Sequence, residues 1–90
     1  MQVKFTNYFL HTKQRPDRAT IKMEWIELAF YNPVFEQVQS DGRIRRWAYI
    51  VEIEKYLRIV ILEDNETVHN AFFDRSYSDI KKKSNEDNIL

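Results

Sequence analysis

Hydrophobic and polar residues follow a helical spacing in the first third of the chain and a strand-like spacing afterwards. Between residues 21 and 31, apolar side chains recur at positions i, i+4, i+7 and i+8, which is typical of an amphipathic helix. These are Ile21, Trp25, Leu28 and Ala29. Thr20 can cap the first turn, and Asn32-Pro33 ends the pattern. We therefore predict a helix over residues 21–31.

An earlier segment, residues 7–14, contains the apolar run Tyr8, Phe9 and Leu10. Pro16 disfavours the helical conformation at the residue before it, so a helix here has to end before Arg15. We predict a short helix over residues 7–14, with a strand over residues 3–9 as the alternative.

Four later segments carry β-branched and aromatic residues and are separated by turn-forming residues. They are residues 34–39, 44–53, 56–62 and 67–73. Gly42 allows the positive φ angle of a hairpin turn, Glu54-Lys55 marks a second turn and Asp64-Asn65 a third. Arg58 alone interrupts the apolar run 56–62, so this run is predicted to be the central strand.

This order of elements predicts an α+β fold, in which one or two N-terminal helices pack on a single antiparallel sheet of about four strands. A chain of 90 residues makes one domain. We place that domain at residues 1–76. Residues 77–90 are predicted to be a polar, mobile tail, because the hydrophobic pattern ends after Arg75.

The composition supports a folded chain, since 43% of residues are hydrophobic and 14% aromatic. The absence of cysteine excludes disulfides and thiolate zinc sites and favours a cytoplasmic protein. No apolar run reaches the roughly 20 residues of a membrane span, and the first residues do not form a signal peptide. We expect no membrane association.

The formal net charge is zero, with 14 basic and 14 acidic residues. A neutral chain argues against indiscriminate nucleic-acid binding, which depends on bulk positive charge. The charge is uneven, however, because residues 1–23 contain five basic residues and only one acidic residue. A local basic patch is therefore compatible with the sequence.

Arginine and histidine are the candidates for chemistry, since the single glycine excludes a phosphate-binding glycine loop. Strict alternation in the last strand puts His69 and Arg75 on one face. If Arg58 of the preceding strand points the same way, these groups form a site that binds a phosphate and exchanges protons. The alternative is a structural Arg58 that pairs with Glu52 or Glu54. With His11 as the only other histidine, we expect neither metal nor cofactor.

Two further basic groups are candidates for RNA binding. One follows the hairpin turn and comprises Arg43, Arg45 and Arg46, of which the first two share a face with Trp47 and Tyr49. Its alternative role is to protect the edge of the sheet. The other group, His11, Arg15 and Arg18, includes a pair four residues apart that would lie on one helix face. Its alternative role is to form surface ion pairs.

The order of these motifs resembles the small BrnT-like domains of the RelE/ParE toxin superfamily over about residues 8–75. The resemblance rests on Arg15 and Arg18, Trp25-Ile26, Asn32-Pro33, the turn at 41–45, the strand residues 57–60 and residues 68–75. It implies helices against a curved antiparallel sheet and a metal-independent endoribonuclease that a co-encoded antitoxin inhibits. Arg58 and Arg75 match the family's catalytic positions, and His69 and His11 are candidates by position.

The sequence thus leaves two main hypotheses. The first is a toxin-like ribonuclease that uses Arg58, Arg75, His69 and His11. The second is a non-catalytic module on the same fold, which binds a protein partner or forms a homodimer through exposed aromatic residues. A nucleic-acid-binding protein without catalysis is a third hypothesis.

Overall fold

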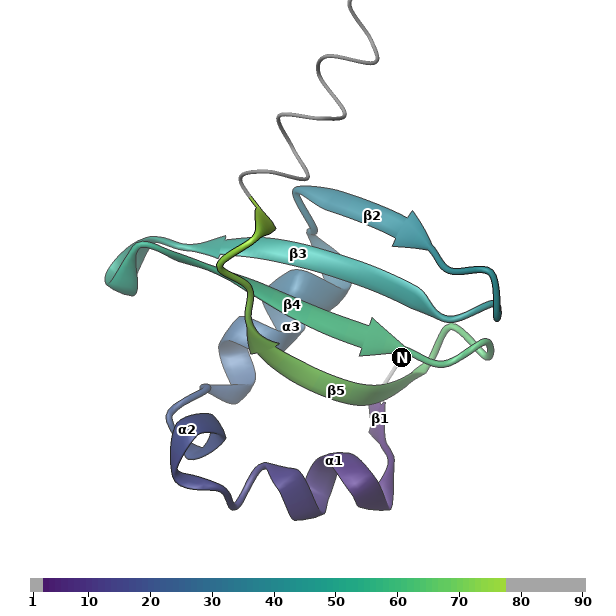
Figure 1. The fold of residues 1–90 in the computed structure, drawn as a ribbon, viewed down its shortest axis with the longest axis horizontal. Coiled ribbons are helices and arrows are strands. Elements are labelled where there is room, and N and C mark those ends of the chain that lie inside the picture. The colour runs from purple at the N-terminus through teal and green to yellow at the C-terminus, as the bar shows by residue number, and fades with distance from the viewer. Residues whose placement is uncertain (1–2, 78–90) are drawn as a thin grey trace, which may run out of the picture.

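The computed structural model describes residues 3–77 of the chain. Three short helices precede most of a five-stranded sheet (Figure 1). The elements are β1 (Lys4–Phe5), α1 (Asn7–Thr12), α2 (Pro16–Ala19), α3 (Met23–Tyr31), β2 (Phe35–Val38), β3 (Ile44–Ile50), the 3-10 helix η1 (Val51–Ile53), β4 (Lys55–Ile61) and β5 (Thr67–Phe73). The predicted α+β class is confirmed.

The sheet is a single one, as predicted, but it is mixed and has five strands in the order β1-β5-β4-β3-β2, where about four antiparallel strands were predicted. β2 to β5 form an antiparallel meander with β4 in the centre, as predicted for residues 56–62. The fifth strand, β1, pairs with β5 in parallel, with Lys4 opposite Thr67 and Phe5 opposite Val68. A strand of two residues is too short to leave a hydrophobic pattern, which explains why it was not predicted.

The N-terminal segment contains both of the alternatives for residues 3–14, because β1 is followed at once by α1. Thr6 caps α1 by accepting a hydrogen bond from the backbone N–H of Phe9 at 3.0 Å. The helix ends at Thr12, earlier than predicted. Pro16 then begins the separate four-residue helix α2, where its fixed φ angle and missing N–H are tolerated.

The main helix, α3, begins at Met23 rather than at residue 21. Lys22 occupies the N-cap position without a side-chain hydrogen bond, and Thr20, the predicted cap, instead ends α2. Asn32-Pro33 ends α3 as predicted.

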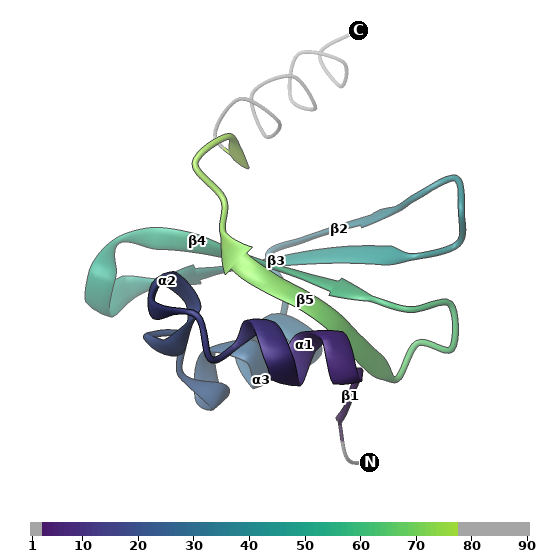
Figure 2. The same ribbon diagram turned by 60° about the horizontal axis from the view of Figure 1, so that its bottom comes forward.

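The core lies between the helices and one face of the sheet, and Figure 2 shows the three helices together on that side. The helical layer contributes Phe9 of α1, Ile21 of the link between α2 and α3, and Trp25, Ile26, Ala29 and Phe30 of α3. The sheet contributes Ile44, Ala48, Ile50, Leu57, Ile59, Ile61, Val68 and Ala71. Because alternate strand residues point to opposite faces, the remaining positions form a second face without helices. We call this second face the open face.

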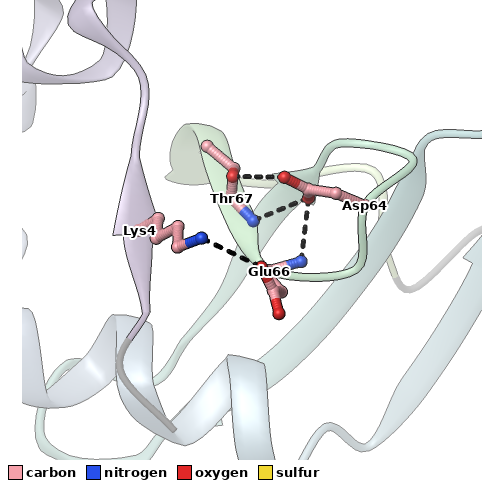
Figure 3. A network of polar contacts seen from close by, with 4 residues as sticks. All are labelled: Lys4, Asp64, Glu66 and Thr67. Carbon is pink, nitrogen blue, oxygen red and sulfur yellow. Dashed lines mark hydrogen bonds and ion pairs between the residues drawn. The ribbon is translucent and has the colours of Figure 1, made fainter.

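Two tight turns fix the register of the meander. Gly42 closes the β2–β3 hairpin with φ of 90°, and an added Cβ would lie 2.9 Å from the Cγ of Glu63. In the β4–β5 turn, the Asp64 carboxylate accepts hydrogen bonds from the backbone N–H groups of Glu66 and Thr67 (Figure 3). The Thr67 hydroxyl, which donates to the Asp64 carboxylate at 2.6 Å, and these two backbone N–H groups lower the pKa of Asp64. Lys4 joins β1 to this turn through Glu66 at 3.2 Å.

The strand predicted over residues 44–53 ends earlier, because β3 stops at Ile50. The last three predicted strand residues form the 3-10 helix η1, which leads into β4. The indole N–H of Trp25 in α3 donates to the Glu52 carboxylate at 2.8 Å and holds this connection against the helix layer.

The folded part reaches beyond the predicted boundary at residue 76. Tyr77, which we assigned to the tail, is only 3% exposed and packs against Trp47, Phe35 and Tyr56 on the open face. The rest of the predicted tail, 78–90, lies outside the described residues. No helix within residues 3–77 is long and apolar enough to cross a bilayer.

Candidate functional site

The open face combines aromatic and arginine side chains on neighbouring strands. Opposite residues in an antiparallel pair project to the same side. Arg58 of β4 lies opposite Trp47 of β3 and Phe72 of β5, so all three belong to the open face. The Arg58 guanidinium carbon lies 4.2 Å from the centre of the Phe72 ring and 6.0 Å from that of Trp47. These rings hold the cation flat against the sheet.

Asp74 is the polar centre of this arrangement, and its side chain is only 5% exposed. It accepts hydrogen bonds from the indole N–H of Trp47 at 2.9 Å and from the backbone and hydroxyl of Ser76 at 2.9 and 2.6 Å. The Nη1 of Arg58 lies 3.5 Å from Oδ2 of Asp74, the oxygen that also accepts from Trp47, whereas the Ser76 donors bind Oδ1. Asp74 thereby ties the end of β5 to both central strands of the open face.

The electrostatics of this pair follow from burial and from the donors. Burial alone would raise the pKa of Asp74, but the hydrogen bonds from Ser76 and Trp47, together with Arg58, more than offset it and lower the pKa. Burial lowers the pKa of Arg58, Asp74 raises it and Arg45 lowers it, with a net decrease. Asp74 is therefore an anion at neutral pH and Arg58 remains a cation. The sequence left Glu52 or Glu54 as the structural partner of Arg58, whereas the observed partner is Asp74.

A groove of about 550 Å³ borders the open face at the end of β5. We call it the arginine groove. It lies between α2, the turn before β4 and the segment after β5, and it is lined by Asp17, Arg18, Glu54, Lys55, Tyr56, Phe72, Phe73, Asp74 and Arg75. Arg58 does not line this groove, but it contacts two residues that do, Phe72 and Asp74.

Three cations of the groove have no carboxylate partner. Within residues 3–77, the ion pairs do not include Arg18, Lys55 or Arg75. Arg18 instead donates to the Asn70 amide oxygen at 2.5 Å, and the Lys55 ammonium lies over the ring of Phe73. Arg75 is exposed and makes no polar contact with the described part of the chain. Their charges are therefore available to an anion that enters the groove.

Glu54 stands on the rim of the groove in an unusual backbone conformation. Its φ and ψ angles are 52° and 47°, in the left-handed region, where a residue with a Cβ is strained by about 1 kcal/mol. Such strain is often found at functional sites. The conformation places an exposed carboxylate beside Lys55 and the other groove cations.

His69 does not line this groove. The strict alternation that would place His69 and Arg75 on one face of β5 is interrupted. β5 has one extra residue, His69, between the pairs Ile61–Val68 and Val60–Asn70. This bulge reverses the faces after it, so Ala71 faces the helices. His69 hydrogen-bonds to Thr6 at 3.1 Å and stacks on Tyr8. It lies six residues from Arg75, or roughly 20 Å along an extended chain.

The pKa of His69 is lowered by burial and by the charge of Arg43. The unfolded chain, with an ordinary pKa of about 6.5, therefore takes up this proton before the folded chain does. We expect the free energy of unfolding to fall as the pH drops below about 6.5, and to fall less in His69→Gln. Urea unfolding of both proteins at pH 7.5 and 5.5 measures this difference. Equal losses of stability in the two proteins would contradict it.

The predicted N-terminal group separates in the structure. His11 is exposed on α1, while Arg15 is the N-cap of α2, so these two residues do not share one helix face as predicted. Arg18 alone of this group reaches the arginine groove.

The predicted hairpin group also divides. Arg45 lies on the open face opposite Val60, and Arg43 pairs with Asp41 at 3.8 Å. Arg46 points to the helix-covered face. There it donates to the carbonyl of Phe30 at 2.8 Å, near the C-terminus of α3, and pairs with Glu36 at 3.7 Å. Arg46 thus supports the fold and does not join the surface of Arg43 and Arg45.

Of the predicted site residues, Arg75 and Arg18 line the arginine groove, whereas Arg58 lies outside its lining and contacts the groove residues Phe72 and Asp74. The sequence did not identify the groove residues Asp74, Tyr56 and Phe72, because their shared location depends on non-local pairing. Lys55 and Glu54 were recognised only as a turn. The described residues contain no cluster of three or more His, Cys, Asp or Glu side chains that could hold a metal ion.

No family model, curated protein or solved structure matches this chain.

Proposed function

We propose that this chain is a metal-independent endoribonuclease that binds an RNA phosphate in the arginine groove. The observation that carries the proposal is the convergence of Arg18, Lys55 and Arg75, three cations without a carboxylate partner among residues 3–77, next to the orientated guanidinium of Arg58. A phosphate in the transition state of RNA cleavage carries additional negative charge. Fixed cations stabilise that charge more than they stabilise the ground state.

The groove also offers a proton acceptor. In the proposed reaction, Glu54 accepts the proton of the ribose 2′-hydroxyl, and the 2′-oxygen attacks phosphorus. The bond from phosphorus to the 5′-oxygen breaks, and solvent protonates that oxygen. The products are a 2′,3′-cyclic phosphate and a 5′-hydroxyl end. The sequence predicts that His69 and His11 exchange protons. Neither histidine lines the groove, so we assign this role to Glu54.

Arg75→Ala tests the proposal without disturbing the fold, because Arg75 is exposed. Purified protein should cleave single-stranded RNA in EDTA and leave cyclic phosphate ends. Loss of one charged hydrogen bond to phosphate should slow cleavage by about 10- to 150-fold. Lys22→Ala, a matched change at the start of α3, should leave the rate unchanged. Absence of cleavage by the wild-type protein, or equal rates for both variants, would overturn the proposal.

The same proposal includes a protein partner. A toxin-like ribonuclease has to be held inactive in its host, which the family resemblance assigns to an antitoxin. Covering the arginine groove with an acidic segment of that partner would be sufficient, since the groove carries unpaired cations. Growth arrest on expression, relieved by Arg75→Ala, is the cellular counterpart of the cleavage assay.

A second candidate function is a non-catalytic interaction module. It is favoured by β2, whose outer edge is unpaired in the described sheet. Val34 and Val38, at either end of this edge, are 57% and 65% exposed. An edge of this kind can accept a strand from a partner or from a second copy. Wild-type protein that binds such a partner through β2 and cleaves no RNA would favour this function.

A further inference from the structure

The open face carries another cation beyond the arginine groove. Arg45 of β3 lies opposite Val60, one diagonal step from Arg58 of β4, which corresponds to about 7–8 Å between the two residues. The two guanidinium groups are close enough that the charge of Arg45 acts on Arg58. Arg45 and Arg58 therefore belong to one continuous surface.

The charge of Arg45 is held but not neutralised. Its Nη1 lies 3.5 Å from the amide oxygen of Gln37, and its Nε donates to the amide oxygen of Gln39 at 2.8 Å when that amide is turned toward it. Amides orientate a guanidinium without cancelling its charge. Arg43, by contrast, is paired with Asp41. Two glutamines thus hold Arg45 in place while leaving its charge available.

We propose that Arg45 forms a second phosphate subsite, so that the substrate is a single strand of RNA lying across the open face from the arginine groove to Arg45. This inference rests on the proposed function. Arg45 lies five residues along β3 from Ile50, which pairs with Lys55 of the groove, or roughly 17 Å. Single strands suit this path because Tyr49, which is 37% exposed on the same face as Arg45, offers a ring on which an unpaired base can stack. RNA-binding sheets of similar size hold about two or three bases.

Binding of oligonucleotides of different lengths tests the subsite. The probes are labelled 2′-O-methyl oligonucleotides of two and six nucleotides, which lack the attacking hydroxyl and are not cleaved. We expect the wild-type protein to bind the hexamer at least tenfold more tightly than the dimer. Arg45→Gln should weaken hexamer binding about tenfold and leave dimer binding unchanged. The slope of the logarithm of the hexamer binding constant against the logarithm of the salt concentration should become shallower by about 0.7. Lys22→Gln, the matched control on the helix side, should change neither.

Comparing the two variants distinguishes failure of the Arg45 subsite from failure of the proposed ribonuclease function. If Arg75→Ala weakens binding of both probes while Arg45→Gln changes neither, the groove stands and the Arg45 subsite is overturned. If the wild-type protein binds no probe at low salt, both proposals fail. A duplex that binds as tightly as the single-stranded hexamer would overturn the single-strand assignment. Circular dichroism of Arg45→Gln confirms that the variant is folded.

Discussion

Asp74→Ala is expected to lower the free energy of unfolding by about 3–5 kcal/mol, a large part of the total for a domain of this size. The substitution removes the acceptor of the Trp47 indole and of two Ser76 donors, and it leaves the half-buried Arg58 without its carboxylate. The loss combines unsatisfied buried donors with an unpaired buried charge. Urea unfolding followed by circular dichroism measures it.

Glu66→Ala is the matched control, because it also removes a carboxylate that forms an ion pair. Its side chain is 39% exposed and its partner Lys4 is 67% exposed, so the expected loss is below about 1 kcal/mol. Asp74→Asn should fall between the two variants, since an amide oxygen still accepts one of the hydrogen bonds. If the unfolding midpoints of Asp74→Ala and Glu66→Ala coincide, Asp74 does not have the stabilising role that its contacts indicate.

Asp74 also gives this stability a defined pH dependence. Because its pKa is lower in the folded chain, its contribution is fully present above the ordinary pKa of about 4 and is lost as the pH falls through the folded pKa. This window lies below the one expected for His69, so the two losses should appear as separate steps in wild-type protein. Asp74→Asn should show a smaller lower step, since Asp64 also has a lowered pKa and contributes in this window, and it should retain the upper step.

Arg58→Lys is expected to lower kcat/KM for RNA cleavage by about 10- to 150-fold, the effect of losing one charged hydrogen bond to phosphate, while leaving the protein folded. Arginine can pair with Asp74 through one nitrogen and still present other N–H donors to a phosphate. Lysine offers a single charged nitrogen, which Asp74 would occupy, and it lacks the flat surface that stacks on Phe72. Steady-state kinetics together with a urea midpoint separate loss of activity from loss of stability.

Arg15→Lys is the control for this exchange, since Arg15 is exposed at the start of α2 and lies outside the groove. Its kcat/KM should change less than about threefold, because a point charge replaces an unstacked guanidinium there. A rate for Arg58→Lys equal to that of Arg15→Lys would show that Arg58 has no direct part in catalysis.

The elements with a long repeating pattern were predictable from the sequence. β5 has the predicted bounds 67–73, the apolar run around Arg58 forms the central strand, and Gly42 closes the predicted hairpin. In each case the signal is local, because it depends on the alternation of neighbouring side chains or on the one residue that tolerates a positive φ angle.

The site was predictable only in part, because it depends on interactions between distant segments. The bulge at His69 leaves no mark in the sequence, yet it determines which side chains of β5 face the helices. Alternation puts Arg46 on the opposite face from Arg45, but its structural role depends on the position of the α3 carboxyl end, which the sequence does not give. Asp74 could not be assigned to Arg58 before the pairing of β4 with β5 was known.

The parallel pairing of β1 with β5 has a consequence for how the chain folds during synthesis. β1 and the residue that follows it bond to a strand far along the chain, and Thr6 and His69 are 63 positions apart. At about 5–20 residues per second, a ribosome needs roughly 3–13 s to make that stretch. The first strand therefore remains unpaired while the earlier strands of the meander, β2 to β4, are synthesised. Nascent chains that stop before β5 should leave β1 open to protease.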